Sequence, residues 1–338
     1  MGRNTNTLKS DTAREFLGKR EYKDMPRLKL ARIMYKQNPL LYKSVDDARH
    51  VLRYLAGKTG AAMMKRMGKM NDLVEEKDRP RNPYNLPASD ETIYEPYVIT
   101  GHKRVGILCD IHVPYHSVSA LTLAIDYLKK QKIDALLLNG DTIDAHRLSK
   151  YVKHPNKRNF KLELDTFKSL FDVFEKEFKC QIYFKIGNHE ERYEQFLCEK
   201  AGELVGIEEF EFENIIKARA RGIKMIGDQR IMKLNSLNGI HGHEYKGGIS
   251  APVNVARGLY LKGKVSAFQG HNHQSSTHTE SDMNGKVVTT YSIGCLSELH
   301  PAYLPLNKWN WGFGEVDLDP NGENYEFRNH TIFKGKIY

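Results

Sequence analysis

Cysteine is scarce in this sequence, and its spacing excludes a disulfide-stapled domain. Four cysteines occur among 338 residues, widely separated, without a Cys-x-x-Cys pair and without a preceding secretory signal. We therefore expect all of them to be reduced thiols. They are Cys109, Cys180, Cys198 and Cys295.

Long hydrophobic runs are also missing, as are internal repeats and low-complexity tracts. The chain opens on polar residues, and no apolar stretch approaches the roughly 20 residues that span a bilayer. These absences exclude a transmembrane helix and a repeat architecture. We expect a soluble, cytoplasmic protein with no membrane partner.

Acidic residues are in short supply only near the start of the chain. The whole sequence has a formal net charge of +10, and residues 1–70 hold 17 Lys and Arg against 6 Asp and Glu. The remaining chain is therefore close to neutral. The basic character belongs to the N-terminal segment, where it bears on the choice of partner.

This basic segment has the pattern of a small helical module. We expect Asp11 to cap a helix over residues 12–19, Pro26 to precede a second helix, and Ser44 to cap a third over residues 46–55. Apolar residues at helical spacing predict a small core. These positions are Leu28, Ala31, Met34, Tyr35, Val45, Ala48, Val51, Leu52 and Leu55.

Two roles fit the basic module, and both stay open. Clustered Lys and Arg neutralise phosphates and dominate non-specific affinity, so a nucleic-acid-binding module resembling a helix-turn-helix is one interpretation. The other is a solvated basic cap that packs on the enzyme or binds an acidic protein. We divide the chain into this basic helical module at 1–60, a linker at 61–100 and a main domain at 101–338.

The main domain first alternates strand and helix patterns and then continues with strands alone. This order predicts an α/β fold in which two sheets pack as a sandwich with helices outside. The expected strands are Val105–Cys109, Ala135–Asn139, Gln181–Ile186, Ile223–Ile226, Asn238–His241, Val265–Gln269, Val287–Ser292 and Gly314–Leu318. The expected helices are Ser119–Gln131, Leu162–Phe178, Glu191–Glu199, Phe210–Arg219 and Ala251–Leu261.

Five short polar clusters follow the ends of expected strands. They offer carboxylates, imidazoles and one amide oxygen but no thiol, and this donor set suits cations such as Mn, Fe and Zn. Asp110 and His112 lie two residues apart after a strand, so both side chains would leave the same face and can share an ion. The clusters are Cys109–His112, Gly140–Asp144, Gly187–Glu190, Ile240–His243 and Gly270–His273.

These clusters, in this order, resemble those of the calcineurin-like metallophosphoesterase family, from about Lys103 onward. The resemblance implies a four-layer α/β/β/α sandwich and two divalent metal ions. It also implies two ligand sets that share one aspartate. Metal one would take Asp110, His112, Asp141 and His273, and metal two would take Asp141, Asn188, His241 and His271.

The resemblance further implies a mechanism. A hydroxide that bridges the two metals would attack phosphorus in line, His189 would assist the leaving oxygen, and Asp144 would orient His189. Ligand sets of this kind accept Mn, Fe, Zn or Ni, and we expect Mn first. No organic cofactor is needed.

The fourth cluster offers two histidines for one ligand position. In the family the ligand directly follows the strand, which implies His241 and leaves His243 to contact the substrate or the ligands; the choice between them stays open. Trp309 and Trp311 beside the last strand fit either core packing or the lining of the cleft.

Weaker candidates for substrate contact lie just past the ligand clusters. Residues 146–161 form a basic loop that could hold a phosphate backbone, or could simply be a solvated connection to the next helix. The candidates are His116, His146, Arg147 and Lys150.

The sequence departs from the protein phosphatases of the family. Those members resemble Gly-Asp-x-Val-Asp-Arg-Gly and Arg-Gly-Asn-His-Glu, whose two arginines hold the substrate phosphate. Here Ala145 and His146 stand in place of Arg-Gly, and Ile186 in place of the second arginine. The sequence looks more like phosphoesterases of bacterial and phage genomes.

We therefore expect a two-metal enzyme that hydrolyses phosphodiester bonds, with DNA or RNA as substrate and the basic module as a nucleic-acid-binding element. A small-molecule phosphatase or a cyclic-nucleotide phosphodiesterase is the first alternative. A nucleic-acid or partner-binding protein with a vestigial metal site is the second.

Overall fold

The computed structural model contains two compact units, Met1–Asp90 and Glu91–Tyr338. It describes residues 5–19, 22, 25–55, 87, 94–150, 159–227, 229–245, 253–320 and 322–338. Most of the linker expected at 61–100 lies outside these residues. Within that linker, Tyr97–Val98 form strand β1.

Three helices enclose the small core of the N-terminal unit. They are α1 (Thr5–Gly18), α2 (Arg27–Gln37) and α3 (Val45–Leu55). As expected, Pro26 precedes α2, and Ser44 caps α3 because its Oγ accepts the N–H of Asp47 at 3.1 Å. The buried core consists of Ala13, Phe16, Leu30, Ala31, Met34, Tyr42, Ala48 and Leu52.

Two details expected of these helices are wrong. Helix α1 begins at Thr5, so Asp11 lies inside it and pairs with Arg14 at 2.8 Å instead of capping. Leu28 is 40% exposed, and Leu30 is buried in its place. The inner face of α2 is therefore rotated from the expected one.

The larger sheet of the second unit has the strand order β13-β12-β11-β2-β3-β4-β5. Strands β2 to β5 run parallel, while β11, β12 and β13 pair antiparallel at one side. The strands are β2 (Arg104–Leu108), β3 (Ala135–Asn139), β4 (Gln181–Lys185), β5 (Lys224–Ile226), β11 (Trp311–Leu318), β12 (Tyr325–Phe333) and β13 (Lys336–Ile337).

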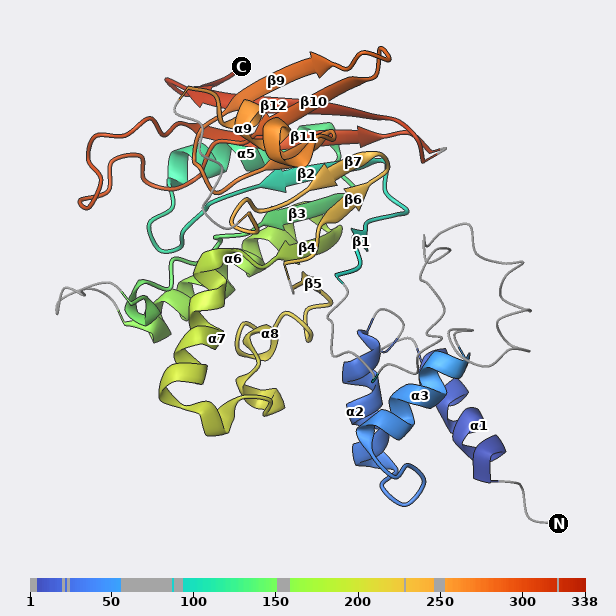
Figure 1. Ribbon diagram of the computed structural model, residues 1–338. Helices are drawn as coiled ribbons and strands as arrows, with labels where there is room; N and C mark the ends of the chain where they lie inside the picture. The colour runs from blue at the N-terminus through green and yellow to red at the C-terminus, as the bar shows by residue number, and fades with distance from the viewer. Residues whose placement is uncertain are drawn as a thin grey trace. The chain divides into compact units, whose positions relative to one another are not determined.

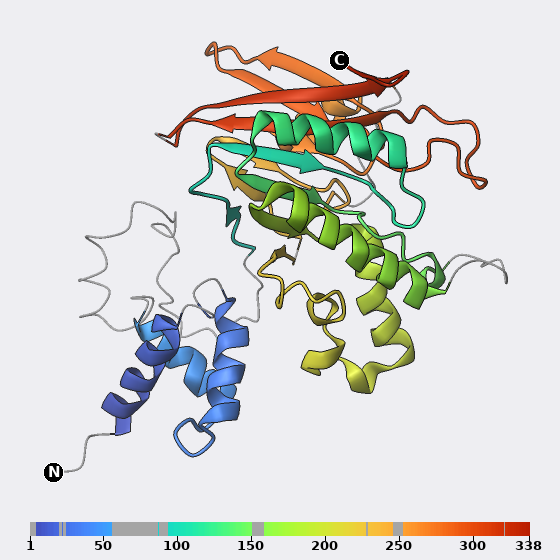
Figure 2. The same ribbon diagram turned by 180° about the vertical axis from the view of Figure 1, so that it is seen from behind.

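Both faces of this sheet are buried, as the unbroken apolar run of β3 indicates. Leu136 and Leu138 point to the helices, whereas Ala135 and Leu137 point to the second sheet. Helices α5 (Val118–Gln131) and α6 (Phe160–Phe178) cover the outer face, as Figure 2 shows from behind.

The smaller sheet has the order β1-β6-β7-β8-β10-β9 and packs against the inner face of the larger one (Figure 1). Helix α9 (Val255–Gly263) covers its outer face, where Val255 and Leu259 pack against Ile240 and Ala267. The expected four-layer α/β/β/α sandwich is confirmed. The new strands are β6 (Met232–Leu234), β7 (Leu237–Gly239), β8 (Ala267–Gln269), β9 (Ser276–Ser281) and β10 (Val287–Ser292).

All eight expected strands are present with small shifts at their ends, and five further strands were not expected: β1, β6, β9, β12 and β13. The helix expected over Phe210–Arg219 is shorter, because only α8 (Phe212–Ile215) is helical there. Helix α7 (Asn188–Lys200) matches its expectation. Helix α9 begins at Val255 instead of Ala251, although residues 251–252 lie outside the described part.

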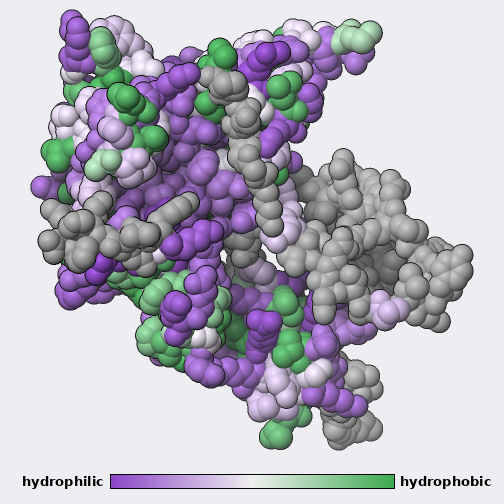
Figure 3. Space-filling view, turned by 60° about the vertical axis from the view of Figure 1, so that its left-hand side comes forward, coloured by the Kyte–Doolittle hydropathy of each residue, from purple (hydrophilic) through white to green (hydrophobic). Residues whose placement is uncertain are grey.

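One face of the protein is predominantly polar (Figure 3). On the face seen in Figure 3, hydrophobic residues form small separated patches on a largely hydrophilic surface. None of the described helices combines the length and the apolar character needed to cross a membrane.

Candidate metal centre

The polar clusters meet where parallel strands of both sheets end. In the larger sheet they follow β2, β3 and β4, whose carboxyl ends lie at one edge because these strands are parallel. In the smaller sheet they follow β7 and β8, which are also parallel. The expected site residues that the fold brings together are Asp110, His112, Asp141, Asp144, Asn188, His189, His241, His271 and His273.

Asp110, His112 and His273 form a first group able to hold a metal ion, with one ligand atom of each within 4.8 Å of the others. Nε2 of His273 lies 3.3 Å from Oδ1 of Asp110 and 3.1 Å from Nε2 of His112. All three side chains are buried. These residues belong to the ligand set expected for metal one.

Asp141, His241 and His271 form a second such group. Nε2 of His241 lies 3.2 Å from Oδ2 of Asp141 and 3.3 Å from Oδ1 of Asn188. Nδ1 of His241 donates to the backbone carbonyl of Asn139 at 2.8 Å, which fixes the ring and points Nε2 into the site. This group and Asn188 make up the set expected for metal two.

His243 is directed elsewhere. Its Nε2 lies 3.0 Å from a carboxylate oxygen of Glu191, whereas His241 faces Asp141. The geometry therefore favours His241 over His243 as the ligand. The assignment of individual residues to the ions stays a prediction.

The carboxylate of Asp141 lies between the two groups. Its Oδ2 is 3.2 Å from Nε2 of His241 and 3.9 Å from Nε2 of His112. Only a carboxylate in such a position can contribute to both ligand sets. This placement is what the bridging role expected of Asp141 requires.

The backbone of the predicted ligands is unusual. Asp110, His112, Asp141, His271 and His273 all have positive φ, between 49° and 65°. Residues other than glycine adopt this left-handed region at a cost of order 1–3 kcal/mol each, and the conformation persists where the surroundings enforce it. Such strain concentrated in five neighbouring loop residues is typical of a functional site.

Glycines in the clusters allow the carboxylates to come close to the backbone. A Cβ atom at Gly187 would lie 2.4 Å from Oδ1 of Asp141, and one at Gly270 would lie 2.6 Å from Oδ2 of Asp110. Any larger residue would displace these oxygens. The glycines that mark the motifs in sequence are therefore required by the geometry of the carboxylates.

The electrostatics of the cluster test whether cations fit it. Burial disfavours charge on His241, but the carboxylates of Asp141 and Asp110 outweigh burial and raise the pKa of His241 to about 10. Burial is likewise outweighed at His273, where Asp110 raises the pKa to about 10. The carboxylates therefore give the cluster an excess of negative charge, which favours protonated His241 and His273. Divalent cations would neutralise the same carboxylates and displace those protons.

The imidazoles of His271 and His112 also fit cations, because their pKa values are lowered instead of raised. Burial, followed by the charge of His241, lowers the pKa of His271 to about 4, and burial lowers the pKa of His112. Both rings are therefore neutral near pH 7, which is the form that binds metals. In the described part of the chain, Nδ1 of His271 is buried without a hydrogen-bond partner, as expected of an atom reserved for a ligand. The residues fit two cations.

His189 lies beside the metal groups in the first turn of α7. Its Nδ1 donates to the backbone carbonyl of Asp144 at 2.8 Å, and its Nε2 lies 3.8 Å from Oδ2 of Asp141. Burial opposes protonation of His189, but the charge of Asp141 and a hydrogen bond with Asp144 raise its pKa. His189 and Asp144 therefore lie close enough for Asp144 to orient His189. Their roles at the leaving oxygen remain predictions.

Arg192 completes this group and was missed in the sequence. It lies one turn after His189 on α7, and its Nη1 donates to the carbonyl of Asp144 at 2.8 Å. Its Nη2 lies 3.0 Å from Nε2 of His189. The spacing of three residues on a helix was the available signal. Arg192 brings a permanent positive charge to a site that lacks the two protein-phosphatase arginines.

Glu190 connects two of the ligand loops through hydrogen bonds. Its buried carboxylate accepts backbone N–H groups from the loops after β3 and β4. The donors are Asp141 at 2.9 Å, Thr142 at 2.7 Å, Ile143 at 3.1 Å and Gly187 at 2.9 Å. Glu190 ends the Gly-Asn-His-Glu cluster, so the motif marked it without showing this role.

Glu244 supports the loop after β7 in a similar way. It accepts the N–H groups of His241 at 3.0 Å and Gly242 at 2.7 Å. The fully buried Lys185 on β4 pairs with it at 3.0 Å. No pattern in the sequence singled out Glu244 or Lys185, because the two partners of this pair are distant from each other in sequence.

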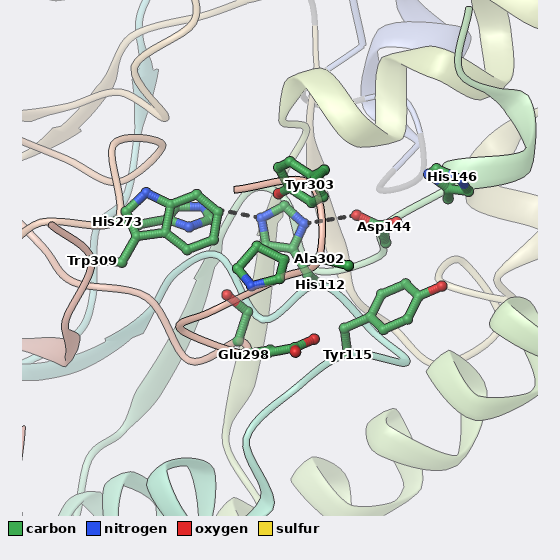
Figure 4. A pocket seen from close by; sticks show the side chains of 11 residues that line it. His112, Tyr115, Asp144, His146, His273, Glu298, Ala302, Tyr303 and Trp309 are labelled. Carbon is green, nitrogen blue, oxygen red and sulfur yellow. Dashed lines mark hydrogen bonds and ion pairs between the residues drawn. The ribbon is translucent and has the colours of Figure 1, made fainter. Parts of the chain in front are cut away.

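A cavity of about 140 Å³ borders the first metal group. In Figure 4, dashed lines join His273, His112 and Asp144, and Trp309 lies against His273. Trp309 therefore lines the cleft, one of the two roles left open for it, whereas Trp311 donates its indole N–H to the carbonyl of Ser297. The complete lining is His112, Tyr115, Asp144, His146, His273, Ser297, Glu298, Pro301, Ala302, Tyr303 and Trp309.

The weaker substrate candidates divide around this cavity. His146, in a short 3-10 helix over His146–Leu148, lines it. His116, Arg147 and Lys150 are not part of its lining. Much of the basic loop that carries the last two, residues 151–158, lies outside the described residues.

A four-layer sandwich whose strand ends gather buried histidines, carboxylates and an amide defines a metal-dependent phosphoesterase, a hydrolase of phosphoric esters. The model of the calcineurin-like phosphoesterase family matches residues 103–289, which is more than half of the chain. The chain belongs to this family. The family uses two metal ions, and the described residues include the clusters that could hold them.

Individual relatives are distant. The chain is 24% identical over 247 residues to the gene 54 protein of Mycobacterium phage L5, a match that covers 70% of this chain and 96% of that protein. Among solved structures it is similar to Vps29 complexed with Zn from Entamoeba histolytica, with 12% identity, 70% and 96% coverage and a TM-score of 0.37. It is also similar to YfcE, a phosphoesterase from E. coli, with 11% identity, 67% and 98% coverage and a TM-score of 0.33.

Proposed function

We propose that this enzyme hydrolyses phosphodiester bonds in DNA or RNA, with two divalent ions, Mn first among them. The cavity beside the first metal group carries this proposal. It has two carboxylates, Asp144 and Glu298, and no Lys or Arg along its lining in the described part of the chain. A doubly charged phosphomonoester would meet no Lys or Arg along this lining. A diester has one charge less and a second organic substituent to place in the cavity.

Asp110, His112, Asp141 and His273 would hold one ion, and Asp141, Asn188, His241 and His271 the other. When bound, the two ions supply positive charge beside the phosphoryl group and make hydroxide available near neutral pH. Glu190 and Glu244 keep the ligand loops in place, so that the ligands are positioned before substrate arrives.

In this proposal, His189 transfers a proton to the leaving oxygen. Because its Nδ1 donates to the carbonyl of Asp144, Nε2 is the nitrogen available to the substrate. The charge of Asp141 and a hydrogen bond with Asp144 raise the pKa of His189, which favours protonation of the ring. Arg192, at 3.0 Å from the same Nε2, is placed to attract the phosphate oxygens to this position.

The N-terminal unit supports the choice of a nucleic acid. Its second and third helices bury most of their apolar side chains and leave most of their basic ones exposed to solvent, where they can neutralise phosphates. A role in substrate binding follows from this charge and is part of the proposal. The exposed basic residues are Arg27, Lys29, Arg32, Lys36 and Arg53.

The test is Mn-dependent hydrolysis of single-stranded DNA, duplex DNA, RNA and bis-(p-nitrophenyl) phosphate at low and high salt, with Asp141→Asn as the inactive control. We expect polymer cleavage that falls steeply as salt rises, since each phosphate contact adds about 0.9 to the logarithmic salt dependence on duplex DNA. Turnover of the small diester alone would contradict the nuclease and favour the small-molecule alternative. Absence of bound metal and of all turnover would favour the binding protein.

The role of the basic unit needs its own variant. Neutralising four exposed positions of α2 together, with Arg27→Gln, Lys29→Gln, Arg32→Gln and Lys36→Gln, should weaken nucleic-acid cleavage and flatten its salt dependence. The same variant should leave hydrolysis of the small diester unchanged. A control with Arg27→Lys and Arg32→Lys keeps the charge and should behave as the unmodified protein. Equal polymer cleavage by all three proteins would exclude the binding role.

A further inference from the structure

The cavity beside the first metal group has an aromatic wall whose function is not explained by metal binding. We propose that it is a subsite for a single nucleobase that packs against Tyr303 and Trp309. The inference rests on the proposed phosphodiesterase activity, because the phosphorus of the same substrate must reach the metal centre. Figure 4 shows both rings close to His112 and His273.

One end of the segment that carries these rings is fixed to the first ligand loop. The N–H of Leu296 donates to the carbonyl of Asp110 at 3.1 Å. The N–H of Ser117 donates to the carbonyl of Leu296, and that of Glu298 to the carbonyl of Tyr115, both at 2.8 Å. The segment after β10 is therefore an extension of the loop that holds Asp110 and His112.

The other end is fixed to the last ligand loop. The N–H of Asn310 donates to the carbonyl of His273 at 3.0 Å, and Oδ1 of Asn310 accepts the N–H of Ser275 at 2.8 Å. The indole of Trp309 lies with its centroid 4.1 Å from that of His273. The aromatic wall is thus attached to both loops of the first metal group, which fixes its position relative to Asp110 and His273.

Between these anchors, the chain exposes a large aromatic side chain. Tyr303 is 74% exposed, and its ring centroid lies 6.4 Å from that of Trp309 at 65°. Asn307 braces the turn, because its side chain accepts the N–H of Trp309 at 2.8 Å and donates to the carbonyl of Leu304 at 2.9 Å. A braced turn that holds an exposed ring beside a catalytic centre provides a face for a flat ligand.

The polar groups of the cavity favour a nucleobase over other flat groups. Glu298 and Ser297 offer oxygen acceptors to the ring N–H and amino groups of a base, whereas the ring of a phosphotyrosine has no such donors. The volume of about 140 Å³ is well below the roughly 300–1,000 Å³ of pockets that enclose a drug-sized ligand, so it takes one ring system. The absence of Lys and Arg from its described lining indicates a single base and not a stretch of phosphate backbone.

The kinetic test compares two diesters that release the same p-nitrophenolate. One is the p-nitrophenyl ester of thymidine 5′-monophosphate, and the other is the corresponding ester of base-free deoxyribose phosphate. We expect the unmodified enzyme to prefer the first in kcat/KM. Tyr303→Leu and Trp309→Leu should each reduce that preference at least about fivefold, the lower range of base stacking on an aromatic side chain. Tyr303→Phe keeps the ring and should keep the preference.

A binding measurement is independent of the metals. In saturation-transfer NMR with metal-free protein, the base protons of thymidine should receive more saturation than its sugar protons. This difference should disappear in Tyr303→Leu and persist in Tyr303→Phe. Equal transfer to base and sugar in the unmodified protein, or a kinetic preference that survives both leucine variants, would overturn the subsite. Higher turnover of phosphotyrosine than of either diester would assign the wall to a phosphotyrosyl ring instead.

The two proposals fail in different ways. If the protein hydrolyses p-nitrophenyl phosphate but neither diester, the phosphodiesterase activity is excluded whether or not thymidine binds. If both diesters are hydrolysed equally well and thymidine shows no base contact, the activity stands and the subsite is excluded.

Discussion

The two metal groups differ in what surrounds them, and of their residues only His271 is half-buried instead of buried. Asp141, His241 and His271, which we call the closed side, are braced in part by the chain's own carboxylates: Glu190 accepts the N–H of Asp141, and Glu244 accepts the N–H of His241. Asp110, His112 and His273, which we call the open side, border the cavity and its aromatic wall. We therefore expect metal retention to depend mainly on the closed side and substrate choice mainly on the open side.

Asp141 belongs to both sides, so its loss should have the largest effect. Asp141→Asn keeps the shape but removes the charge between the two groups, and each ion contributes several kcal/mol of charge stabilisation. We expect kcat for bis-(p-nitrophenyl) phosphate to fall at least about 10,000-fold. Elemental analysis after loading should show fewer than two metal ions per chain. Full activity with two ions bound would remove Asp141 from both ligand sets.

Replacing His189 tests proton transfer to the leaving oxygen, a role that belongs to neither metal group. Removing a proton donor costs typically 10²- to 10⁴-fold, but only where the leaving oxygen needs a proton. We expect His189→Gln to slow cleavage of dinucleotides, which have an alkoxide leaving group, by about 100-fold or more. Release of p-nitrophenolate, which leaves readily without a proton, should change much less. Equal losses on both substrates would show that His189 positions the site and does not transfer a proton.

Glu190 tests the bracing of the ligand loops. The carboxylate accepts four backbone N–H groups, and a glutamine would present its NH2 group to some of them. Groups that support metal ligands typically contribute 10- to 100-fold to metal affinity or activity. We expect a loss in this range for Glu190→Gln, seen as weaker Mn binding in calorimetric titration. The preference for a base-containing diester should not change.

The matched control for this variant lies on the same helix. Glu194 is exposed one turn further along α7, and Glu194→Gln changes the same charge without touching a ligand loop. It should bind Mn as the unmodified protein does. If the two variants weaken Mn binding equally, long-range charge and not the bracing of the loops is responsible.

The closed and open sides also differ in how far the sequence predicted them. Ligand clusters were predictable because each motif is local and follows an apolar strand that the sequence pattern identifies. The aromatic wall was not, because Tyr303 reaches the cavity only through the anchoring of residues 296–298 and 310 to two other loops. Trp309 could be assigned to the core or to the cleft until that anchoring was known.

The strands that escaped prediction have a related cause. Strand β9 reads Ser-Thr-His-Thr-Glu-Ser and is largely exposed, so it has no apolar alternation, and its pairing with β10 alone makes it a strand. Strand β6 has only three residues, and β1 pairs with it from far away in the sequence. Non-local pairing determines these elements, and no local pattern announces it.

The smallest expected effect is on the stability of the folded protein and concerns Glu163, a buried residue near the open side. Glu163 on α6 is buried below the turn of Ala145 and His146, and burial, followed by the charge of Asp144, raises its pKa to about 7. The folded protein therefore retains a proton that the unfolded chain releases above about pH 4.5, so the free energy of unfolding falls as pH rises from about 4.5 to 7.

Glu163→Gln should remove that contribution while keeping an oxygen to accept from the turn. Between pH 5 and 7.5 the variant should gain on the order of 2 kcal/mol relative to the unmodified protein, as measured by urea unfolding at both values. Glu194→Gln, which changes an exposed carboxylate, should show no such relative gain. A constant difference in stability at the two pH values would mean that Glu163 ionises normally and that the turn under His146 is held by packing alone.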